Sequence, residues 1–387
     1  MRKTFKWAFR ALLLLALVLG GVAIWKREQI SRLLAVNTLF EADRIVQNFS
    51  NMDDLFLSRV IDLPDGPPSP LPVMPMALPD ISDWVEARAV TALVVLKDGN
   101  LVFEDYYLGT SGSDLRISWS VAKSFLSALM GIVLAEGDIA SIDDQVTRYV
   151  PALKGSAYEG ASIRNVLNMA SGVRFNEDYL DFNSDINKMG RVLALGGSMD
   201  GFAAGLSERA REPGQAWQYV SIDTHVLGMV IRGATGRSIP DLMGEKLLAP
   251  LGLEADPIML TDGDGVAFVL GGLNLRSRDY ARLGQLYLQN GQWNGVQIVP
   301  SDWVEASTVS SAPGLPDYTG YGFQWWLPVD AAPGEFYARG VYGQYIYINR
   351  PAGVVIALGS ADLLFDEAGT NEENIEMFRK IAATLGG

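Results

Sequence analysis

Apolar, β-branched runs occur near the start of the main body of this chain and again near its end, with helical patterns between them. The first two runs, at 92–96 and 101–107, flank an Asp98-Gly99 pair that is typical of a tight hairpin. Three later runs have the same character: 322–327, 344–349 and 354–359. Helical spacing lies between, at 125–134, 226–232 and 280–288. The pattern predicts an α+β fold in which distant segments form one antiparallel sheet around an inserted, mostly helical region.

The chain begins with a basic and then strongly apolar segment. Four of the first ten residues are lysine or arginine, and an uninterrupted apolar run follows over 11–25. Such a segment is typical of a membrane anchor or a signal peptide, and the positive-inside rule places its start in the cytoplasm. We expect an inner-membrane anchor that holds the rest of the chain in the periplasm or outside. Cleavage after Ala23, which would release a secreted protein, is the alternative.

Proline marks the next boundary. Seven of the 18 prolines lie between Leu63 and Pro79, where neither a regular helix nor a central strand can form, so this stretch is predicted to be an extended strap. A last helix over 372–385 is expected to start from Thr370 as its N-cap. The chain therefore divides into an anchor or signal at 1–26, helices and strap at 27–79, and a main domain at 80–387 with a helical subdomain at about 140–300.

Composition excludes several kinds of chemistry. Lysine and arginine total 31 against 45 acidic residues, so no overall positive field favours nucleic acid. The chain has no cysteine and one histidine, His225, which rules out thiolate nucleophiles, disulfides and multi-histidine metal sites. No Gly-x-Ser-x-Gly element is present, and His225 lies in a pattern typical of a helix face. Nothing in the sequence implies a metal or another cofactor.

A Ser-x-x-Lys element remains as the best catalytic candidate. Ser120 and Lys123 open an almost uncharged helical stretch, and residues three apart share one face of a helix. The first turn of a helix and an apolar environment both disfavour an ammonium group, so the pKa of Lys123 is expected to be low enough for a base. On its own, the pattern also fits a serine that caps the helix and a solvated lysine.

Further segments follow this element in a fixed order. They are 134–139 (Leu-Ala-Glu-Gly-Asp-Ile), 149–151 (Tyr-Val-Pro), 167–172, 219–221 (Tyr-Val-Ser), 271–273 and 277–279. The ordered set resembles the serine β-lactamase and penicillin-binding-protein superfamily over roughly residues 80–385. It is most similar to the class C-like branch, which also holds esterases and 6-aminohexanoate-dimer hydrolases. The resemblance implies a β-lactamase/transpeptidase-like fold, an acyl-enzyme and no cofactor.

The resemblance also assigns catalytic roles. Ser120 resembles the nucleophile, Lys123 its base, and Tyr219 the residue that relays a proton to the leaving group. Neighbouring positive charges are expected to lower the pKa of Tyr219 towards the phenolate form. Ser221 stands where an asparagine is common and still offers substrate a hydroxyl.

The third motif of the superfamily matches Ala338-Arg339-Gly340 here. Gly340 would let substrate approach the strand, and the backbone N–H of Val341 would join that of Ser120 in an oxyanion hole. Ala338 supplies no cation where β-lactamases and D,D-peptidases hold a carboxylate, and Arg339 is expected to point to the other face of the strand. Three aromatic residues are candidates for the walls of a substrate groove: Tyr342, Trp325 and Trp326.

The sequence therefore predicts an exported serine hydrolase that cleaves an amide or ester bond of a small molecule through a Ser120 acyl-enzyme. Two other hypotheses remain open. One is a class C-like β-lactamase or D,D-peptidase, for which the cation missing at Ala338 is unfavourable. The other is a catalytically silent binding protein tethered to the membrane, although such a protein has no need of a buried lysine. The oligomeric state is left open.

Overall fold

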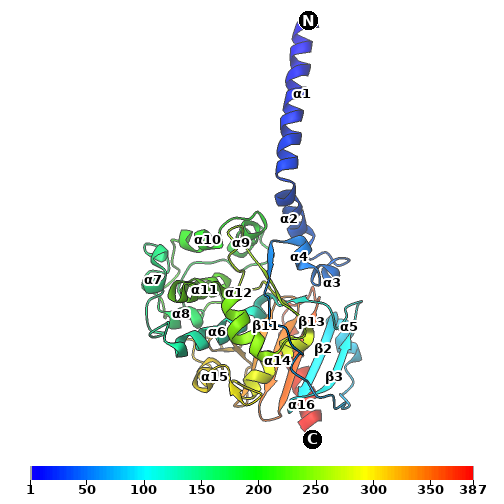
Figure 1. Ribbon diagram of the computed structural model, residues 1–387, viewed down its shortest axis with the longest axis vertical. Helices are drawn as coiled ribbons and strands as arrows, with labels where there is room; N and C mark the ends of the chain where they lie inside the picture. Colours follow the sequence, from blue (N-terminus) through cyan, green and yellow to red (C-terminus); the bar gives the residue numbers. More distant parts are fainter. Residues whose placement is uncertain (1, 387) are drawn as a thin grey trace.

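A seven-stranded antiparallel sheet organises the computed structural model, which describes residues 2–386 (Figure 1). Its strand order is β3-β2-β13-β12-β11-β10-β9. The strands are β2 (Val90–Lys97), β3 (Asn100–Tyr106), β9 (Gly320–Tyr321), β10 (Trp326–Leu327), β11 (Glu335–Gly340), β12 (Gln344–Asn349) and β13 (Val354–Ser360). Because β2 pairs with β13 from the far end of the chain, the predicted α+β fold with a sheet built from distant segments is confirmed.

Of two turns in this sheet, one was predicted from the sequence and one was not. Asp98 and Gly99 take φ values of 48° and 81°, as a tight hairpin between β2 and β3 requires. The single strand expected at 322–327 is wrong, because a turn separates β9 from β10. Within that turn, the backbone carbonyls of Phe323 and Gln324 accept hydrogen bonds from two serine hydroxyls of helix α6 (Ala122–Glu136). Ser127 donates to Phe323 and Ser124 donates to Gln324, each at 2.7 Å.

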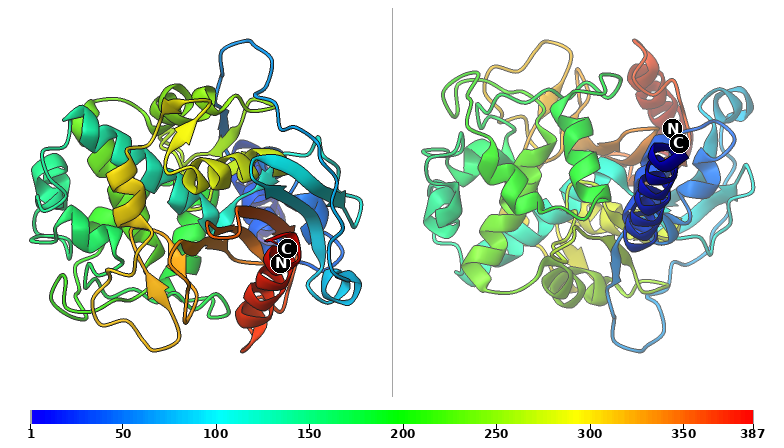
Figure 2. Two further views of the ribbon diagram at one scale, coloured as in Figure 1. Left: turned by 90° about the horizontal axis from the view of Figure 1, so that it is seen from below. Right: turned by 90° about the horizontal axis from the view of Figure 1, so that it is seen from above.

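Helices cover both faces of the large sheet. α14 (Ser277–Leu288) packs on one face, whereas α5 (Ser82–Ala87) and α16 (Thr370–Gly386) pack on the other, where Figure 2 shows α16 beside the strands. Thr370 is the first residue of α16 and not its N-cap, and its hydroxyl donates to the Leu364 carbonyl at 3.0 Å. The expected cap is therefore wrong.

A mostly helical region adjoins one side of the sheet, around the buried helices α6 (Ala122–Glu136) and α11 (Ser221–Thr235). Short helices surround these two: α7 (Val146–Tyr149), α8 (Ile163–Leu167), α9 (Asp185–Ala194), α10 (Met199–Gly205), α12 (Ile239–Met243), α13 (Ala249–Leu251) and α15 (Ser301–Ser307). A four-stranded sheet lies between the two regions, with β1 (Ser58–Val60), β5 (Ile258–Leu260), β6 (Leu273–Leu275) and β4 (Arg116–Ile117) in that order.

The N-terminal helix α1 (Arg2–Trp25) projects from the body (Figure 1). It contains an apolar stretch, Phe5–Val22, of a length and composition that could cross a membrane, and no part of that stretch is buried. A second stretch, Trp119–Glu136, passes the same test but is largely buried as a core helix. These features are weakly compatible with an anchor or a signal. Three helices follow α1: α2 (Arg27–Thr38), α3 (Ile45–Asn48) and α4 (Met52–Leu55).

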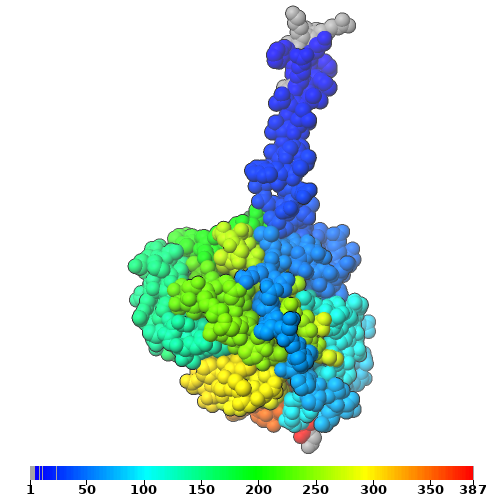
Figure 3. Space-filling model, viewed as in Figure 1, coloured from blue at the N-terminus to red at the C-terminus, as the bar shows by residue number. Residues whose placement is uncertain are grey.

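The proline-rich stretch forms the predicted strap. Residues 63–79 contain no helix, and they run over the surface between the helical region and the sheet (Figure 3). The Ser69 N–H donates to the Gly252 carbonyl at 2.8 Å, and the Met74 N–H donates to the Leu101 carbonyl at 2.9 Å. The strap therefore joins the two regions without adding a central strand to the large sheet.

Candidate active site

Ser120 lies in a single 3₁₀ turn (Trp119–Val121) immediately before α6, so α6 begins two residues later than the sequence suggests. Trp119 has a φ of 42°, a left-handed value that costs energy in any residue with a side chain. The rings of Phe40 and Phe49 pack on Trp119, with centroids 5.7 and 5.6 Å away. The turn that presents the candidate nucleophile is thus held by aromatic residues of the N-terminal segment.

The end of β11 lies against this turn. A Cβ atom on Gly340 would stand 2.8 Å from the Ser118 carbonyl oxygen and 3.0 Å from the Ser120 nitrogen. Only glycine permits so close an approach of strand and turn. Val341, the next residue, lines the same pocket as Ser120. The structure therefore brings together the two residues that were expected to form an oxyanion hole.

Lys123 is the second residue of α6 and its side chain is 2% exposed. Its Nζ donates to the Leu270 carbonyl at 2.8 Å and lies 5.6 Å from the ring centroid of Tyr219. Burial lowers the pKa of Lys123 to about 7, although the charges of Glu177 and Asp223 act in the opposite direction. A large share of Lys123 is therefore neutral near pH 7, which agrees with the role of a base.

The ionisation state of Tyr219 differs from the one predicted from the sequence. Burial, and next the charge of Glu177, raise the pKa of Tyr219 well above its ordinary value. A hydrogen bond with Ser120 and the charge of Arg339 lower the pKa, but they do not offset burial. The expected shift towards phenolate is wrong, because burial of the phenol outweighs the groups that lower its pKa. Tyr219 is a phenol at neutral pH, suited to donate a proton.

A pocket of about 360 Å³ opens beside Ser120. Tyr342, at the tip of the hairpin between β11 and β12, lines it as expected and stacks on Phe40 with ring centroids 4.4 Å apart. Trp325 is instead fully buried against Tyr287, with centroids 4.5 Å apart, so its place in a groove wall is wrong. Trp326 packs on Tyr219 at 5.3 Å and does not line this pocket.

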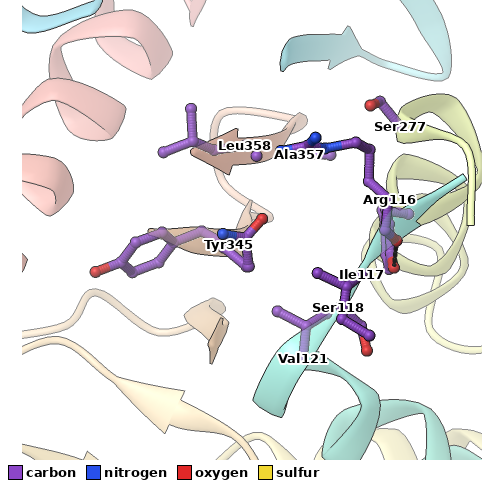
Figure 4. A pocket seen from close by; sticks show the side chains of 11 residues that line it. Arg116, Ile117, Ser118, Val121, Ser277, Tyr345, Ala357 and Leu358 are labelled. Carbon is purple, nitrogen blue, oxygen red and sulfur yellow. Dashed lines mark hydrogen bonds between the residues drawn. The ribbon is translucent and has the colours of Figure 1, made fainter. Parts of the chain in front are cut away.

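A second, much smaller cavity lies behind the nucleophile turn (Figure 4). Its volume is about 20 Å³, and Arg116, Ser118, Val121 and Tyr345 are among the residues that line it. A cavity of that size holds no more than about one water molecule, so it is not a substrate site. Within residues 2–386, no three His, Cys, Asp or Glu side chains are grouped to hold a metal ion.

Comparisons with known proteins agree with this geometry. The family model for Beta-lactamase matches residues 82–385. The chain belongs to this family. It is 29% identical to a 6-aminohexanoate-dimer hydrolase of Paenarthrobacter ureafaciens over 314 residues, which cover 77% of this chain and 79% of the relative. Penicillin-binding protein 4* of Bacillus subtilis is 30% identical over 134 residues, 35% of this chain and 28% of the relative.

The solved structures include a protein from Bacillus anthracis assigned as a 6-aminohexanoate-dimer hydrolase. It superimposes with a TM-score of 0.80 at 23% identity and covers 90% of this chain and 96% of its own. At that identity the likeness shows the fold alone. Together with the family match, it identifies a serine hydrolase of β-lactamase fold.

In this member of the β-lactamase family, the hydroxyl of Ser221 is engaged within the protein. The Ser221 N–H donates to the Glu177 carboxylate at 3.0 Å, and the Ser221 hydroxyl donates to the same carboxylate. Tyr179 donates to it as well, at 2.9 Å. Ser221 lines the pocket, but its proton is committed to Glu177 and not offered to substrate as expected.

Two acids near Lys123, the partly buried Glu177 and the buried Asp223, were not among the residues that the sequence singled out. Burial raises the pKa of Glu177, which lies in a polar stretch that has no recognisable pattern. Asp223 is fully buried, accepts a hydrogen bond from Tyr158 at 2.8 Å and has its pKa raised by burial to about 7. Asp223 could have been found from the sequence, because it is an acidic residue in the first turn of a mostly apolar helix.

In the third motif, Ala338 supplies no cation, whereas the charge of Arg339 acts on Tyr219. Ala338 is buried in the core on one face of β11, while Arg339 donates to the Phe365 carbonyl at 3.2 Å on the other. His225 pairs with Asp200 at 2.8 Å, and neither residue lines the pocket of Ser120. The structure therefore brings Ser120, Lys123 and Tyr219 together, the three residues to which the resemblance gave catalytic roles.

Proposed function

We propose that this protein is an exported serine hydrolase that cleaves an amide or ester bond through an acyl-enzyme on Ser120. The observation that supports it most is Lys123, a fully buried amine with a pKa lowered to about 7, next to Ser120 and Tyr219. A buried amine costs stability, and a base near neutral pH is the use that offsets this cost.

In the first step, the Ser120 hydroxyl attacks the carbonyl carbon of the substrate while its proton passes to neutral Lys123. The N–H groups of Ser120 and Val341 stabilise the oxyanion of the tetrahedral intermediate. Gly340 permits this arrangement, because a side chain there would separate the strand from the turn.

In the second step, the tetrahedral intermediate collapses and the bond to the leaving group breaks. The phenol of Tyr219 donates its proton to the departing amine or alkoxide and regains one from the Lys123 ammonium, which lies near its ring. Neutral Lys123 then takes a proton from a water molecule as that water attacks the acyl carbon. The bond between the acyl carbon and the Ser120 oxygen breaks, the carboxylic acid leaves, and the proton on Lys123 passes to the serine oxygen. Each turnover thus restores neutral Lys123 and protonated Tyr219.

The relatives narrow the range of substrates. The Paenarthrobacter relative is a 6-aminohexanoate-dimer hydrolase, so a linear amide or a simple ester is the substrate class that we favour. The β-lactamase or D,D-peptidase alternative lacks support at Ala338, which is a buried core residue and supplies no cation. α1 is apolar and exposed, which supports an anchor in the inner membrane that holds the catalytic domain on the outer side. The alternative is cleavage of this segment and secretion of the rest.

The test is hydrolysis of p-nitrophenyl acetate by the full chain in lipid nanodiscs. We expect Ser120→Ala to lower kcat/KM by at least about 10³-fold, whereas the exposed control Ser113→Ala keeps wild-type activity. A serine-reactive phosphonate should add its mass to the peptide that holds Ser120. No turnover, or equal turnover in all three proteins, would support the silent binding protein. Hydrolysis of β-lactams in preference to esters and amides would support the β-lactamase alternative.

A further inference from the structure

The pocket beside Ser120 has an apolar outer half with an exposed rim. Leu180 and Phe182 line the pocket although their side chains are 95% and 65% exposed. Met189 and Leu193 of α9 and Phe56 form deeper parts of the same wall. Single exposed apolar residues are ordinary, but two at the mouth of an apolar pocket indicate a contact with apolar material.

Two polar side chains in this half, those of Asn187 and Arg191, already contact other parts of the protein. The Asn187 amide donates to the carbonyls of Tyr179 and Asp181 at 3.0 and 2.9 Å. The Arg191 guanidinium lies over the Phe182 ring at 4.1 Å from its centroid. A polar chain would therefore find few free partners here, whereas an aliphatic chain would bury its surface without loss.

α2 and α9, which both line the pocket, lie on the side of the molecule from which α1 projects (Figure 1). α2 follows α1, supplies Val36 to the wall and packs beside α9, and Leu39 and Phe40 of the turn after α2 line the same wall. Its own Ile30 and Leu34 are exposed one turn apart. If α1 lies in a bilayer, the pocket walls formed by α2 and α9 lie on the side of the body nearest to that bilayer.

We propose that this pocket binds the long acyl chain of an amphiphilic ester or amide, and that such substrates reach Ser120 from the membrane surface. The inference rests on the proposed function, since the chain is attached to the carbonyl that Ser120 attacks. The apolar walls of the pocket continue from the rim past Met189 to Trp119 and Val341 beside the nucleophile. Chain and carbonyl can therefore be bound in one continuous site.

The first experiment measures chain-length dependence with the full chain in phosphatidylcholine nanodiscs. For p-nitrophenyl esters from acetate to decanoate, kcat/KM should rise by up to about fourfold for each added methylene group until the pocket is filled. Gly190 of α9 lines the pocket, and a Cβ there would meet no atom within 4 Å. Gly190→Leu should therefore lower the decanoate-to-acetate ratio of kcat/KM by about tenfold or more.

Gly205→Leu is the matched control. Gly205 is the exposed last residue of α10, where a Cβ also meets nothing, and it does not line the pocket. The esters partition into lipid to the same extent with either variant. A fall in the decanoate-to-acetate ratio for Gly190→Leu but not for Gly205→Leu would therefore show that the pocket binds the acyl chain. A flat chain-length profile in an enzyme that still hydrolyses acetate would overturn the acyl-chain proposal and leave the proposed function intact. Absence of all esterase activity would instead count against the proposed function.

The second experiment tests access from the membrane. Leu180→Ser combined with Phe182→Ser should slow hydrolysis of decanoate ester embedded in vesicles by about tenfold, relative to butyrate ester in solution. The control pair, Val309→Ser with Tyr318→Ser, removes two exposed apolar side chains in the loop after α15, at the end of the body far from α1 (Figure 1). Equal rates for embedded ester in both double variants would show that the substrate arrives as a dissolved amphiphile and would overturn membrane access.

Discussion

The two ends of the pocket differ in what surrounds them. At the inner end, the polar side chains bond to one another or to the backbone, as Lys123 does with Leu270 and Glu177 with Ser221. At the outer end, apolar side chains of α2 and α9 form the wall, and Leu180 and Phe182, in the loop before α9, are exposed. The inner end lies within the part of the chain that matches the β-lactamase family, while α2 lies outside it. The comparison indicates that reaction chemistry and substrate choice are specified by different segments.

Replacing Lys123 should have the largest effect and should act on the inner end alone. Lys123→Met removes the base, so kcat/KM should fall at least about 10³-fold for short and long esters alike. In the wild type, the rate should rise with pH through about 7 as Lys123 loses its proton. A pH–rate profile for each ester checks both statements.

The same substitution should change stability in a pH-dependent way. The folded pKa of Lys123, about 7, lies below the unfolded value near 10.4, so the cost of burying the ammonium is full below pH 7 and vanishes above about pH 10.5. The free energy of unfolding of Lys123→Met relative to wild type should therefore fall by a few kcal/mol between about pH 7 and pH 10. Urea unfolding measures it, with the exposed Lys154→Met as control. A difference that does not change with pH would contradict the low pKa.

Gly340→Ala should be nearly as damaging. The added methyl group would stand 3.0 Å from the Ser120 nitrogen, so strand and turn must separate and the oxyanion site is distorted. We expect kcat to fall by about 10²- to 10³-fold with little change in the preference for chain length. Gly359→Ala, in the same sheet, meets its first atom at an ordinary 3.4 Å and is the control. Similar losses in both variants would point to a general defect of the sheet.

Glu177→Gln should have a smaller effect that appears mainly in the pH profile. The charge of Glu177 raises the pKa of Lys123, so its removal should move the acidic limb of the rate profile to lower pH. The rate at the optimum should fall by about tenfold or less, because the amide oxygen can still accept from the Ser221 N–H. Glu208→Gln, an exposed acid paired with Arg174, should leave the limb in place. An unmoved limb in Glu177→Gln would remove Glu177 from the electrostatics of the site.

Met189→Ala should have the smallest effect and should act on the outer end. Met189 is a buried part of the apolar wall, so its truncation should change the decanoate-to-acetate ratio by about threefold, the contribution of one or two methylene contacts. Met243→Ala, also buried but away from the pocket, controls for lost stability. A large loss on acetate from Met189→Ala would show that the two ends are not separable.

Much of the fold was predictable because it depends on local patterns. The hairpin at Asp98-Gly99 and the strands β12 and β13 follow from alternation and turn residues that act over a few positions. The turn at 322–325 was not predictable, since it is stabilised by hydrogen bonds from Ser124 and Ser127, two serines far away in the sequence. Trp325 was assigned to a groove for the same reason, because burial against Tyr287 is a tertiary contact.

The candidate active site was likewise predictable only in part. Ser120 and Lys123 were predictable from a spacing of three residues, and burial accounts for the lowered pKa of the lysine. The ionisation of Tyr219 was not, because its pKa depends first on burial and then on the charge of Glu177, which a loop brings to the start of α11. Spacing along a helix is visible in one sequence, whereas the approach of a loop to a helix end is not.

The rings of Phe40 and Phe49 pack on Trp119 and Tyr342, and this sets where the chain can be cut. A fragment that begins at residue 82, where the family match begins, would leave both aromatic residues without their cover and would be prone to aggregate. A fragment that begins near residue 27 would retain the complete wall. Processing after Ala23 would likewise keep it, so a released form and a tethered form would share one active site and differ only in the lipid within their reach.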